Sequence, residues 1–173
     1  MANDWQRFHW DLEKSLDAMR PELPPFVFRG AEKSESEIAL KVISSSLMME
    51  RAWTGTATEF ARGLEKRCEE AFDHEPPACV VVLHGSRVIG ASVLDLAVDA
   101  EFHLLTGPCI LHEYRSRGLG SALLHQSLVR LREEGLRRVT ASARVNSVAA
   151  RFIYPKFGST STEFDFDALM ASL

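Results

Sequence analysis

The stretch Arg115-Ser116-Arg117-Gly118-Leu119-Gly120 decides the fold and the kind of site expected in this chain. It separates an apolar, strand-like segment (residues 102–111) from an amphipathic, helix-like one (residues 121–134). A glycine-rich turn that opens a helix presents unpaired backbone N–H groups and the positive end of the helix dipole. Glycine also lets the backbone approach a ligand closely. The stretch therefore predicts a site for a phosphate or diphosphate, with a structural turn that happens to contain arginine as the alternative.

The spacing of the glycines argues against two other phosphate-binding loops. The dinucleotide-binding pattern G-x-G-x-x-G needs a third glycine where Leu123 stands. The pattern Gly-Lys-Ser/Thr of nucleoside-triphosphate-binding loops is absent. What remains is R-x-x-G-x-G at the start of a helix.

A second segment, residues 139–158, strengthens the interpretation of the first. Residues 139–145 alternate as a strand does, Asn146 follows, and a short alanine-containing helix leads to Tyr154 four residues before Gly158. The two segments together resemble the two signatures of the GCN5-related N-acetyltransferase (GNAT) family, and the resemblance covers about residues 26–173. The interval from Asn146 to Tyr154 is one residue longer than in the family, so Ser147 is the alternative to Asn146. His112 and Ser159 also depart from the family pattern, which has proline and an aromatic residue there.

The periodicity predicts an α+β fold, and the resemblance implies a mixed, mostly antiparallel central sheet with helices on both faces. We expect a helical extension over residues 1–25 and a GNAT domain over residues 26–173. The expected elements are a helix over 3–20, a strand at 26–28, helices capped at Ser34 and Thr56, strands over 78–83, 88–98 and 102–111, a helix over 121–134, a strand over 139–145, a short helix before Tyr154 and a strand over 162–166.

The N-terminal helix is expected from apolar residues at helical spacing, followed by the helix-breaking Pro21. We expect it to pack against the domain or against a second copy of the chain in a homodimer. The apolar residues are Trp5, Phe8, Leu12, Leu16 and Met19.

The resemblance implies acetyl-CoA as co-substrate, with its diphosphate on the main chain of the glycine-rich loop. Gly107-Pro108 interrupts a strand, which favours either an ordinary bulge or, as the resemblance implies, a backbone freed to pair with pantetheine. Arg115 and Arg117 would neutralise phosphate charge from the rim. The implied cofactor-binding residues are Cys109, Ile110, Leu111, Arg115, Ser116, Arg117, Gly118, Leu119, Gly120, Ser121 and Asn146.

Acyl transfer from a thioester to an amine needs an acid for the departing thiolate, a base for the amine and a donor for the oxyanion. Tyr154 is the expected acid, with packing beside Pro155 as the alternative. Glu101 and His103 are the candidate bases, although a strand histidine is more often structural. Cys109 lacks a His/Asp arrangement that would activate it, so we expect direct transfer.

The function expected is acetyl-CoA-dependent N-acetyl transfer to a primary amine of a small molecule or peptide. Residues 48–54, with two methionines and Trp53, would shape the acceptor pocket or else belong to the core. A non-catalytic acyl-CoA-binding module is the main alternative, and a nucleotide-phosphate binder unrelated to CoA is a third. The acceptor and the length of the acyl group stay open.

Composition excludes several other classes of protein. The 173 residues are 46% hydrophobic and 25% charged, as in a soluble globular domain. A net charge of −4 argues against nucleic acid as a partner. No apolar run approaches the roughly 20 residues of a membrane helix, and the N-terminus does not resemble a signal peptide. Three scattered cysteines indicate reduced thiols in a cytoplasm, with no metal expected.

Overall fold

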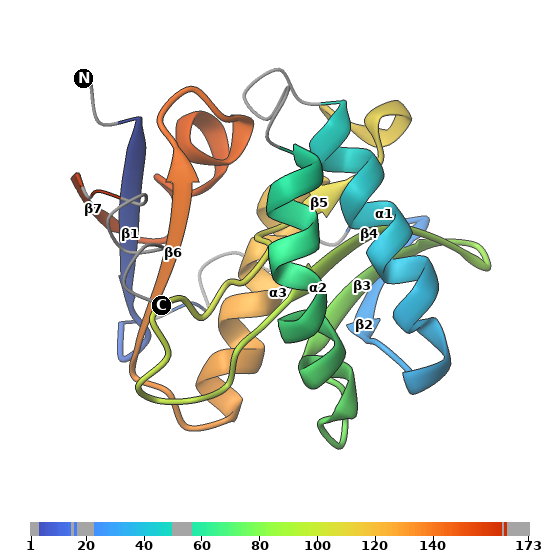
Figure 1. Cartoon of the computed structure of the whole chain (residues 1–173), viewed down its shortest axis with the longest axis horizontal. Helices are drawn as coiled ribbons and strands as arrows, with labels where there is room; N and C mark the ends of the chain where they lie inside the picture. The colour runs from blue at the N-terminus through green and yellow to red at the C-terminus, as the bar shows by residue number, and fades with distance from the viewer. Residues whose placement is uncertain (1–3, 15, 17–22, 50–56, 164, 166–173) are drawn as a thin grey trace.

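The computed structural model describes residues 4–14, 16, 23–49, 57–163 and 165. Its strands form two antiparallel sheets, ordered β2-β3-β4-β5 and β6-β1-β7 (Figure 1). The α+β class is confirmed. The elements are β1 (Trp5–Asp11), β2 (Phe26–Gly30), the 3-10 turn η1 (Lys33–Glu35), α1 (Ser36–Met48), α2 (Ala57–Asp73), β3 (Cys79–His84), β4 (Arg87–Val93), β5 (Cys109–Ile110), the 3-10 turn η3 (His112–Tyr114), α3 (Leu119–Glu133), β6 (Arg138–Arg144), the π-helical turn η4 (Ala149–Ile153) and β7 (Thr160–Glu163).

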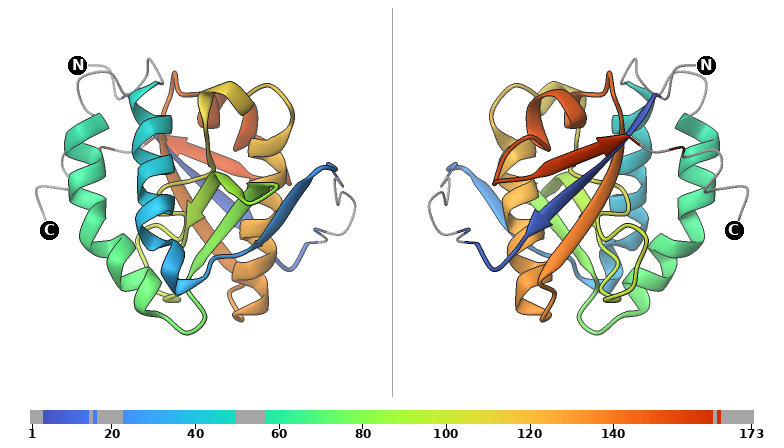
Figure 2. Two further views of the ribbon diagram at one scale, coloured as in Figure 1. Left: turned by 90° about the vertical axis from the view of Figure 1, so that its right-hand side faces the viewer. Right: turned by 90° about the vertical axis from the view of Figure 1, so that its left-hand side faces the viewer.

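Helices cover both faces of the four-stranded sheet, as expected (Figure 2). Helix α1 packs on β4 and β5, and α3 packs on β3 and β4 from the opposite side. Strand β3 is therefore apolar along its length, and residues 79–83 are all buried. The turn between β3 and β4, with Gly85 in the left-handed region, is the expected hairpin. The packing of α3 on β3 and β4 fixes the position of α3, and therefore of the loop before it.

The expected N-terminal helix is wrong, because residues 5–11 form β1, the central strand of the three-stranded sheet. Strand β1 pairs with β6 over its whole length and with β7 on its other edge. Phe8 and Trp10 of the strand, and Leu12 directly after it, alternate with less buried residues and are buried. The helical spacing counted Phe8 and Leu12 but passed over Trp10, which completes the period of two. Residues 17–20 of that expectation lie outside the described residues.

The expected strand over 102–111 is also mostly wrong, since only Cys109–Ile110 form a ladder with β4, and Leu104 makes an isolated bridge with Leu94. Gly107 has a φ of +66° and Pro108 has no N–H, so a ladder cannot run through this dipeptide. Upstream, the N–H groups of His103 and Leu104 both donate to the carbonyl of Thr140, at 2.9 and 3.2 Å. These two hydrogen bonds to Thr140 link the segment before β5 to β6 of the other sheet. In the described residues the strand ladders do not connect the sheets, because β5 pairs with β4 and β6 pairs with β1.

Several element boundaries differ from expectation. Strand β4 ends at Val93 rather than at residue 98, and β7 spans 160–163 rather than 162–166. Glu32, not Ser34, forms a capping box, with Glu35, before α1. The pKa of Glu35 is lowered, chiefly because Arg29 donates two hydrogen bonds to its carboxylate. Thr56, the other expected cap, lies outside the described residues.

Candidate active site

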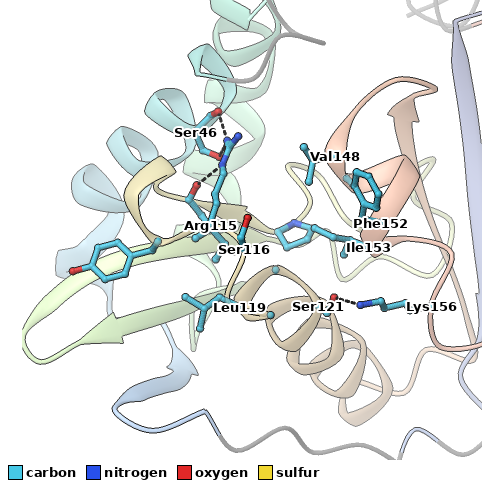
Figure 3. Close-up of a pocket in the computed structure, with 15 residues that line it drawn as sticks. Ser46, Arg115, Ser116, Leu119, Ser121, Val148, Phe152, Ile153 and Lys156 are labelled. Carbon is cyan, nitrogen blue, oxygen red and sulfur yellow. Dashed lines mark hydrogen bonds between the residues drawn. The ribbon is translucent and has the colours of Figure 1, made fainter.

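A cavity of about 480 Å³ lies between the loop after β5, the first turn of α3 and the π-helical turn η4 (Figure 3). Seven of the predicted cofactor-binding residues line it: Ile110, Arg115, Ser116, Gly118, Leu119, Gly120 and Ser121. The other lining residues are Ser46, Pro108, Tyr114, Val148, Ala149, Phe152, Ile153 and Lys156. Cys109, Leu111, Arg117 and Asn146, also predicted, do not line it.

The loop backbone of residues 116–121 offers unused hydrogen-bond donors to this cavity. Ser116 and Gly118 have φ values of +62° and +79°, and Gly118 is the N-cap of α3. The first helical hydrogen bond runs from the N–H of Ala122 to the carbonyl of Gly118. Among the described residues, none of the six N–H groups from 116 to 121 donates a hydrogen bond. Donors in such a turn, at the positive end of a helix dipole, form a concave site for an anion.

The glycine at position 120 is needed for the close packing of η4 against α3 rather than for a turn. A Cβ atom added to Gly120 would lie 2.7 Å from Cδ1 of Ile153. The absence of a side chain therefore lets η4 approach the first turn of α3, and both elements line the cavity.

Lys156 is a lining residue that the sequence analysis missed. Its Nζ donates to Oγ of Ser121 at 2.7 Å, which places a cation at the N-terminus of α3 (Figure 3). The available signal was its position two residues after Tyr154, within the second signature. A cation beside unpaired amide donors raises the attraction of the site for a phosphate.

The two predicted rim arginines have different surroundings. Arg115 donates to the carbonyl and hydroxyl of Ser46, at 2.8 and 3.2 Å, and so ties α1 to this loop. Arg117 lies over the ring of Tyr114, with 5.4 Å from its guanidinium carbon to the ring centroid. Neither arrangement turns the guanidinium toward the loop amides.

The extra residue between Asn146 and Tyr154 is absorbed by the π-helical turn. The N–H of Tyr154 donates to the carbonyl of Ala149 at 2.7 Å, an i→i+5 bond that accommodates one residue more than an α-helical turn. Asn146 is exposed, whereas Ser147 is buried and accepts from the N–H of Ala150 at 3.1 Å. The Ser147 hydroxyl thus satisfies a backbone donor at the start of this turn, whereas Asn146 stays exposed to solvent.

Tyr154 is 2% exposed and lies between the two sheets. Its ring packs against Phe8 and Trp10 of β1, with centroid distances of 5.2 and 5.4 Å. A Cβ added to Gly107 would overlap the Tyr154 hydroxyl. The glycine of the interrupted strand therefore makes room for the phenol, a role that the sequence analysis did not assign to it.

His103 is fixed by its hydrogen bonds. Its Nδ1 accepts from the N–H of Thr140 at 3.1 Å, and its Nε2 lies 3.0 Å from the carbonyl of Ala97. This pattern is that of a neutral imidazole with its proton on Nε2. Burial lowers the pKa of His103, which also favours the neutral ring. Both nitrogens are engaged, so this geometry leaves no lone pair for a substrate proton.

Glu101 faces a second hollow, of about 560 Å³, whose floor includes the buried residues Leu94 and Leu105. One of its carboxylate oxygens pairs with the guanidinium of Arg7 from β1. Asp95 lines the same hollow, whereas His103 does not. The two candidate bases are therefore neighbours in sequence with different access to a ligand.

The three cysteines are buried and free. Burial raises the pKa values of Cys68 and Cys79 to about 12, so both are thiols at neutral pH. Sγ of Cys109 lies 3.7 Å from the carbonyl of Thr106. Of the expected acceptor wall, Met48 and Met49 are exposed, and residues 50–54 lie outside the described part of the chain.

Two searches of the described residues gave negative results. They contain no group of three or more histidine, cysteine or acidic residues placed to hold a metal ion. None of their helices combines the length and apolarity needed to cross a bilayer.

Sequence comparison identifies the family to which this two-sheet α+β fold belongs. The model of the Acetyltransferase (GNAT) family matches residues 46–158. The match covers more than half of the 173 residues, and the chain belongs to this family. The recognition made from the two signatures is thereby confirmed. No curated protein matches the sequence.

Solved structures share the fold at low sequence identity. A GCN5-related N-acetyltransferase from Sphaerobacter thermophilus is 14% identical, with a TM-score of 0.62 over 92% of this chain and 48% of that one. A Drosophila protein is 13% identical, with a TM-score of 0.63 over 91% of this chain and 48% of that one. The glucosamine N-acetyltransferase region of a fungal multi-domain β-N-acetylglucosaminidase is 14% identical, with a TM-score of 0.59 over 94% and 20%. The chain spans half or less of the length of these proteins.

Proposed function

We propose that this protein is an acetyl-CoA-dependent N-acetyltransferase that transfers the acetyl group directly to a primary amine. The observation that carries the proposal is the set of six unpaired N–H groups from 116 to 121, beside Lys156 in a cavity. These donors and this cation suit the diphosphate of CoA. The outer edge of β5 suits the pantetheine arm, because no described strand pairs with it.

Tyr154 is proposed as the acid that protonates the departing thiolate. Its hydroxyl lies against Gly107, next to the strand residues that would meet the pantetheine arm. Enclosure between Phe8 and Trp10 holds the ring in one orientation. A fixed phenol can donate to the sulfur as negative charge develops there.

Glu101 is proposed to receive the proton of the amine, directly or through water. It is exposed and lines a hollow, while the nitrogens of His103 are both engaged within the fold. A backbone N–H near Ile110 would stabilise the oxyanion. A carboxylate at the hollow would also attract a cationic amine.

The alternative is a non-catalytic acyl-CoA-binding module of the same fold. The burial of Tyr154, at 2% exposed, favours it, because a packing role alone would explain that position. In that case CoA would bind, and Tyr154→Phe would change neither binding nor any transfer.

Calorimetry and transfer assays test the proposal together. We expect purified protein to bind acetyl-CoA and to transfer labelled acetyl to at least one member of a panel of polyamines, amino sugars, lysine peptides and peptide N-termini. Without acceptor, the protein mass should stay unchanged after incubation with acetyl-CoA, since direct transfer forms no acyl-enzyme. Absence of CoA binding would reject the proposal, and binding without transfer to any amine would select the module.

A further inference from the structure

The second hollow, which Glu101 lines, is bounded by two segments that carry different charged groups. The last turns of α2 supply one wall, and the segment after β4 supplies another. Backbone hydrogen bonds fix the spacing of these walls. The N–H of Ala78 donates to the carbonyl of Ala71 at 2.9 Å, and the N–H of Leu94 donates to the carbonyl of Ala78 at 2.8 Å. These three residues and Leu105 are buried and give the hollow an apolar floor.

Arg67, on the wall from α2, is a cation without a partner. Its side chain is half-buried, and within the described part of the chain its guanidinium forms no ion pair and no hydrogen bond. Burial removes part of the hydration of a charged group, and an anion that accepts its hydrogen bonds offsets that loss. Arg67 therefore marks the place where this hollow can bind a carboxylate.

Two further ionisable groups line the same wall. Glu70 is exposed and lies one helical turn beyond Arg67, and it forms no ion pair with a described residue. His74 is also exposed, and its Nδ1 lies 3.0 Å from the carbonyl of Pro76. Because water and salt screen an exposed carboxylate, Glu70 leaves most of the charge of Arg67 uncompensated.

The wall after β4 carries carboxylates. One oxygen of Asp95 accepts from the N–H of Ala97 at 3.0 Å, and no described residue donates to its other oxygen. One oxygen of Glu101 pairs with Arg7. Each carboxylate can accept further hydrogen bonds, and an ammonium has three to donate. This wall therefore suits an amine.

The charges of the two walls select among amines. A diamine would bring a second cation toward Arg67, and an amine without an anionic group would leave the guanidinium unpaired. A phosphorylated amine would bring a nearly doubly charged group among three carboxylates, those of Glu70, Asp95 and Glu101. An amine that also carries a single carboxylate satisfies both walls.

We propose that the hollow lined by Arg67, Asp95 and Glu101 binds the acceptor, and that the acceptor is a small amine with a carboxylate, of the class of free amino acids. Its ammonium lies on Asp95 and Glu101, its carboxylate pairs with Arg67, and its apolar part lies on the floor. The inference rests on the proposed function, because it names the acceptor of that same transfer.

The transfer balances with the residues already assigned. The ammonium gives one proton to Glu101, and its nitrogen bonds to the acetyl carbon as the C–S bond of acetyl-CoA breaks. The sulfur takes a proton from Tyr154, and a second proton from the nitrogen returns Tyr154 to its neutral form. The products are the N-acetyl amino acid, CoA and one proton.

Transfer rates with matched pairs of acceptors test the class of acceptor. Each pair consists of an amino acid and its primary amide, which differ in the negative charge that Arg67 would bind. At saturating acetyl-CoA, we expect kcat/KM of the unmodified protein to be about tenfold higher for the acid of the best pair, the effect of one charge-assisted hydrogen bond. The diamine that replaces the carboxylate by a second amino group should be a poorer acceptor than the amide.

Variants of Arg67 locate the carboxylate of the acceptor. Arg67→Ala should raise the KM of the acid about tenfold, with the KM of the amide and both kcat values unchanged. Arg67→Lys should retain part of the preference, because it keeps the charge. Arg67→Gln repeats the neutral substitution with a longer side chain, in case Arg67→Ala lowers the melting temperature. Lys66→Ala is the matched control, since Lys66 is an exposed cation on α2 that does not line the hollow, and it should change no rate.

The outcomes separate the two proposals. Equal kcat/KM for acid and amide in every pair would overturn the class of acceptor while leaving the N-acetyltransferase intact. A preference for the acid that survives in Arg67→Ala and Arg67→Gln would overturn the assignment of the carboxylate to this hollow. Loss of CoA affinity in Arg67→Ala, measured by calorimetry, would overturn it too, because the guanidinium would then serve the co-substrate. Transfer to no amine at all would reject both proposals.

Discussion

Two regions of the molecule differ in how their polar groups are satisfied. Around the first turn of α3, the N–H groups of six consecutive residues have no partner in the described structure, and Lys156 stands beside them. Around Glu101 and His103, the polar groups are paired, with Arg7, Thr140 and Ala97. Unpaired donors indicate a ligand, whereas a buried ring whose two nitrogens are both paired, as in His103, holds the fold together. We therefore expect substitutions in the first region to change CoA affinity and those at His103 to change stability.

Tyr154 lines neither hollow and packs against β1 and Gly107, yet its substitution should have the largest effect. Tyr154→Phe removes the proton donor but keeps the ring that packs on Phe8 and Trp10. We expect kcat to fall by about 100-fold, the usual contribution of a general acid, with little change in KM or in melting temperature. Steady-state kinetics and thermal unfolding measure this. An unchanged kcat would assign the phenol a packing role only.

The turn at Gly118 should have the next largest effect. Gly118→Ala forces a side chain into a left-handed conformation, at a cost of about 1–2 kcal/mol, which would distort the loop and reduce CoA affinity by about tenfold. Gly85→Ala is the matched control, since Gly85 has a similar φ of +61° in the hairpin between β3 and β4. Calorimetry and thermal unfolding compare them: both variants should lose stability, and only Gly118→Ala should lose affinity. Equal affinities would mean that the loop does not hold the ligand.

Lys156 should contribute less than the loop backbone. Lys156→Met removes one charge beside Ser121, and we expect CoA affinity to fall by about fivefold, the effect of a partly screened charge-assisted contact. The loss should shrink as salt is raised in the titration. Lys41→Met, at an exposed ion pair with Glu37 on α1, is the control. A loss of affinity that does not respond to salt would contradict an electrostatic role.

His103 should change stability rather than binding. The folded-state pKa of His103 is lowered from 6.5, so the unfolded chain binds the proton more readily. Its stabilising contribution is present above pH 6.5 and is lost as the pH falls from there toward the folded-state pKa. We expect the melting temperature to fall between pH 7 and 5.5, and to fall less in His103→Gln. CoA affinity at pH 7.5 should be the same in both.

A control is needed because His9 has a pKa lowered in the same direction, by burial and by Arg7. The double variant His9→Gln/His103→Gln should show the flattest pH dependence. If His103→Gln retains the full acid sensitivity while His9→Gln loses it, the assignment to His103 is wrong.

Local features could be predicted from the sequence, and long-range pairings could not. The turn that opens α3 and the short helical turn before Tyr154 are set by neighbouring residues, and both appear where expected. The segment with Trp5, Phe8 and Leu12 fitted a helical period, but its strand partners lie more than 120 residues away. The residues next to this segment in the sequence carry no information about such distant strand partners. The hydrogen bonds of His103 and the contact of Gly107 with Tyr154 could not be predicted for the same reason, because their partners are also distant in the sequence.

Strand β1 has a consequence for how the protein is assembled. It enters the sheet between β6 and β7, so one wall around Tyr154 is built from residues 5–11 together with strands more than 120 residues further along the chain. Such distant pairing is slow to nucleate, because a long loop must close first. During synthesis, β1 would have to wait for residues 138–163 to leave the ribosome before this wall could form. A polypeptide lacking residues 1–13 would retain the whole stretch matched by the family model, yet would need a synthetic peptide of those residues to complete its fold.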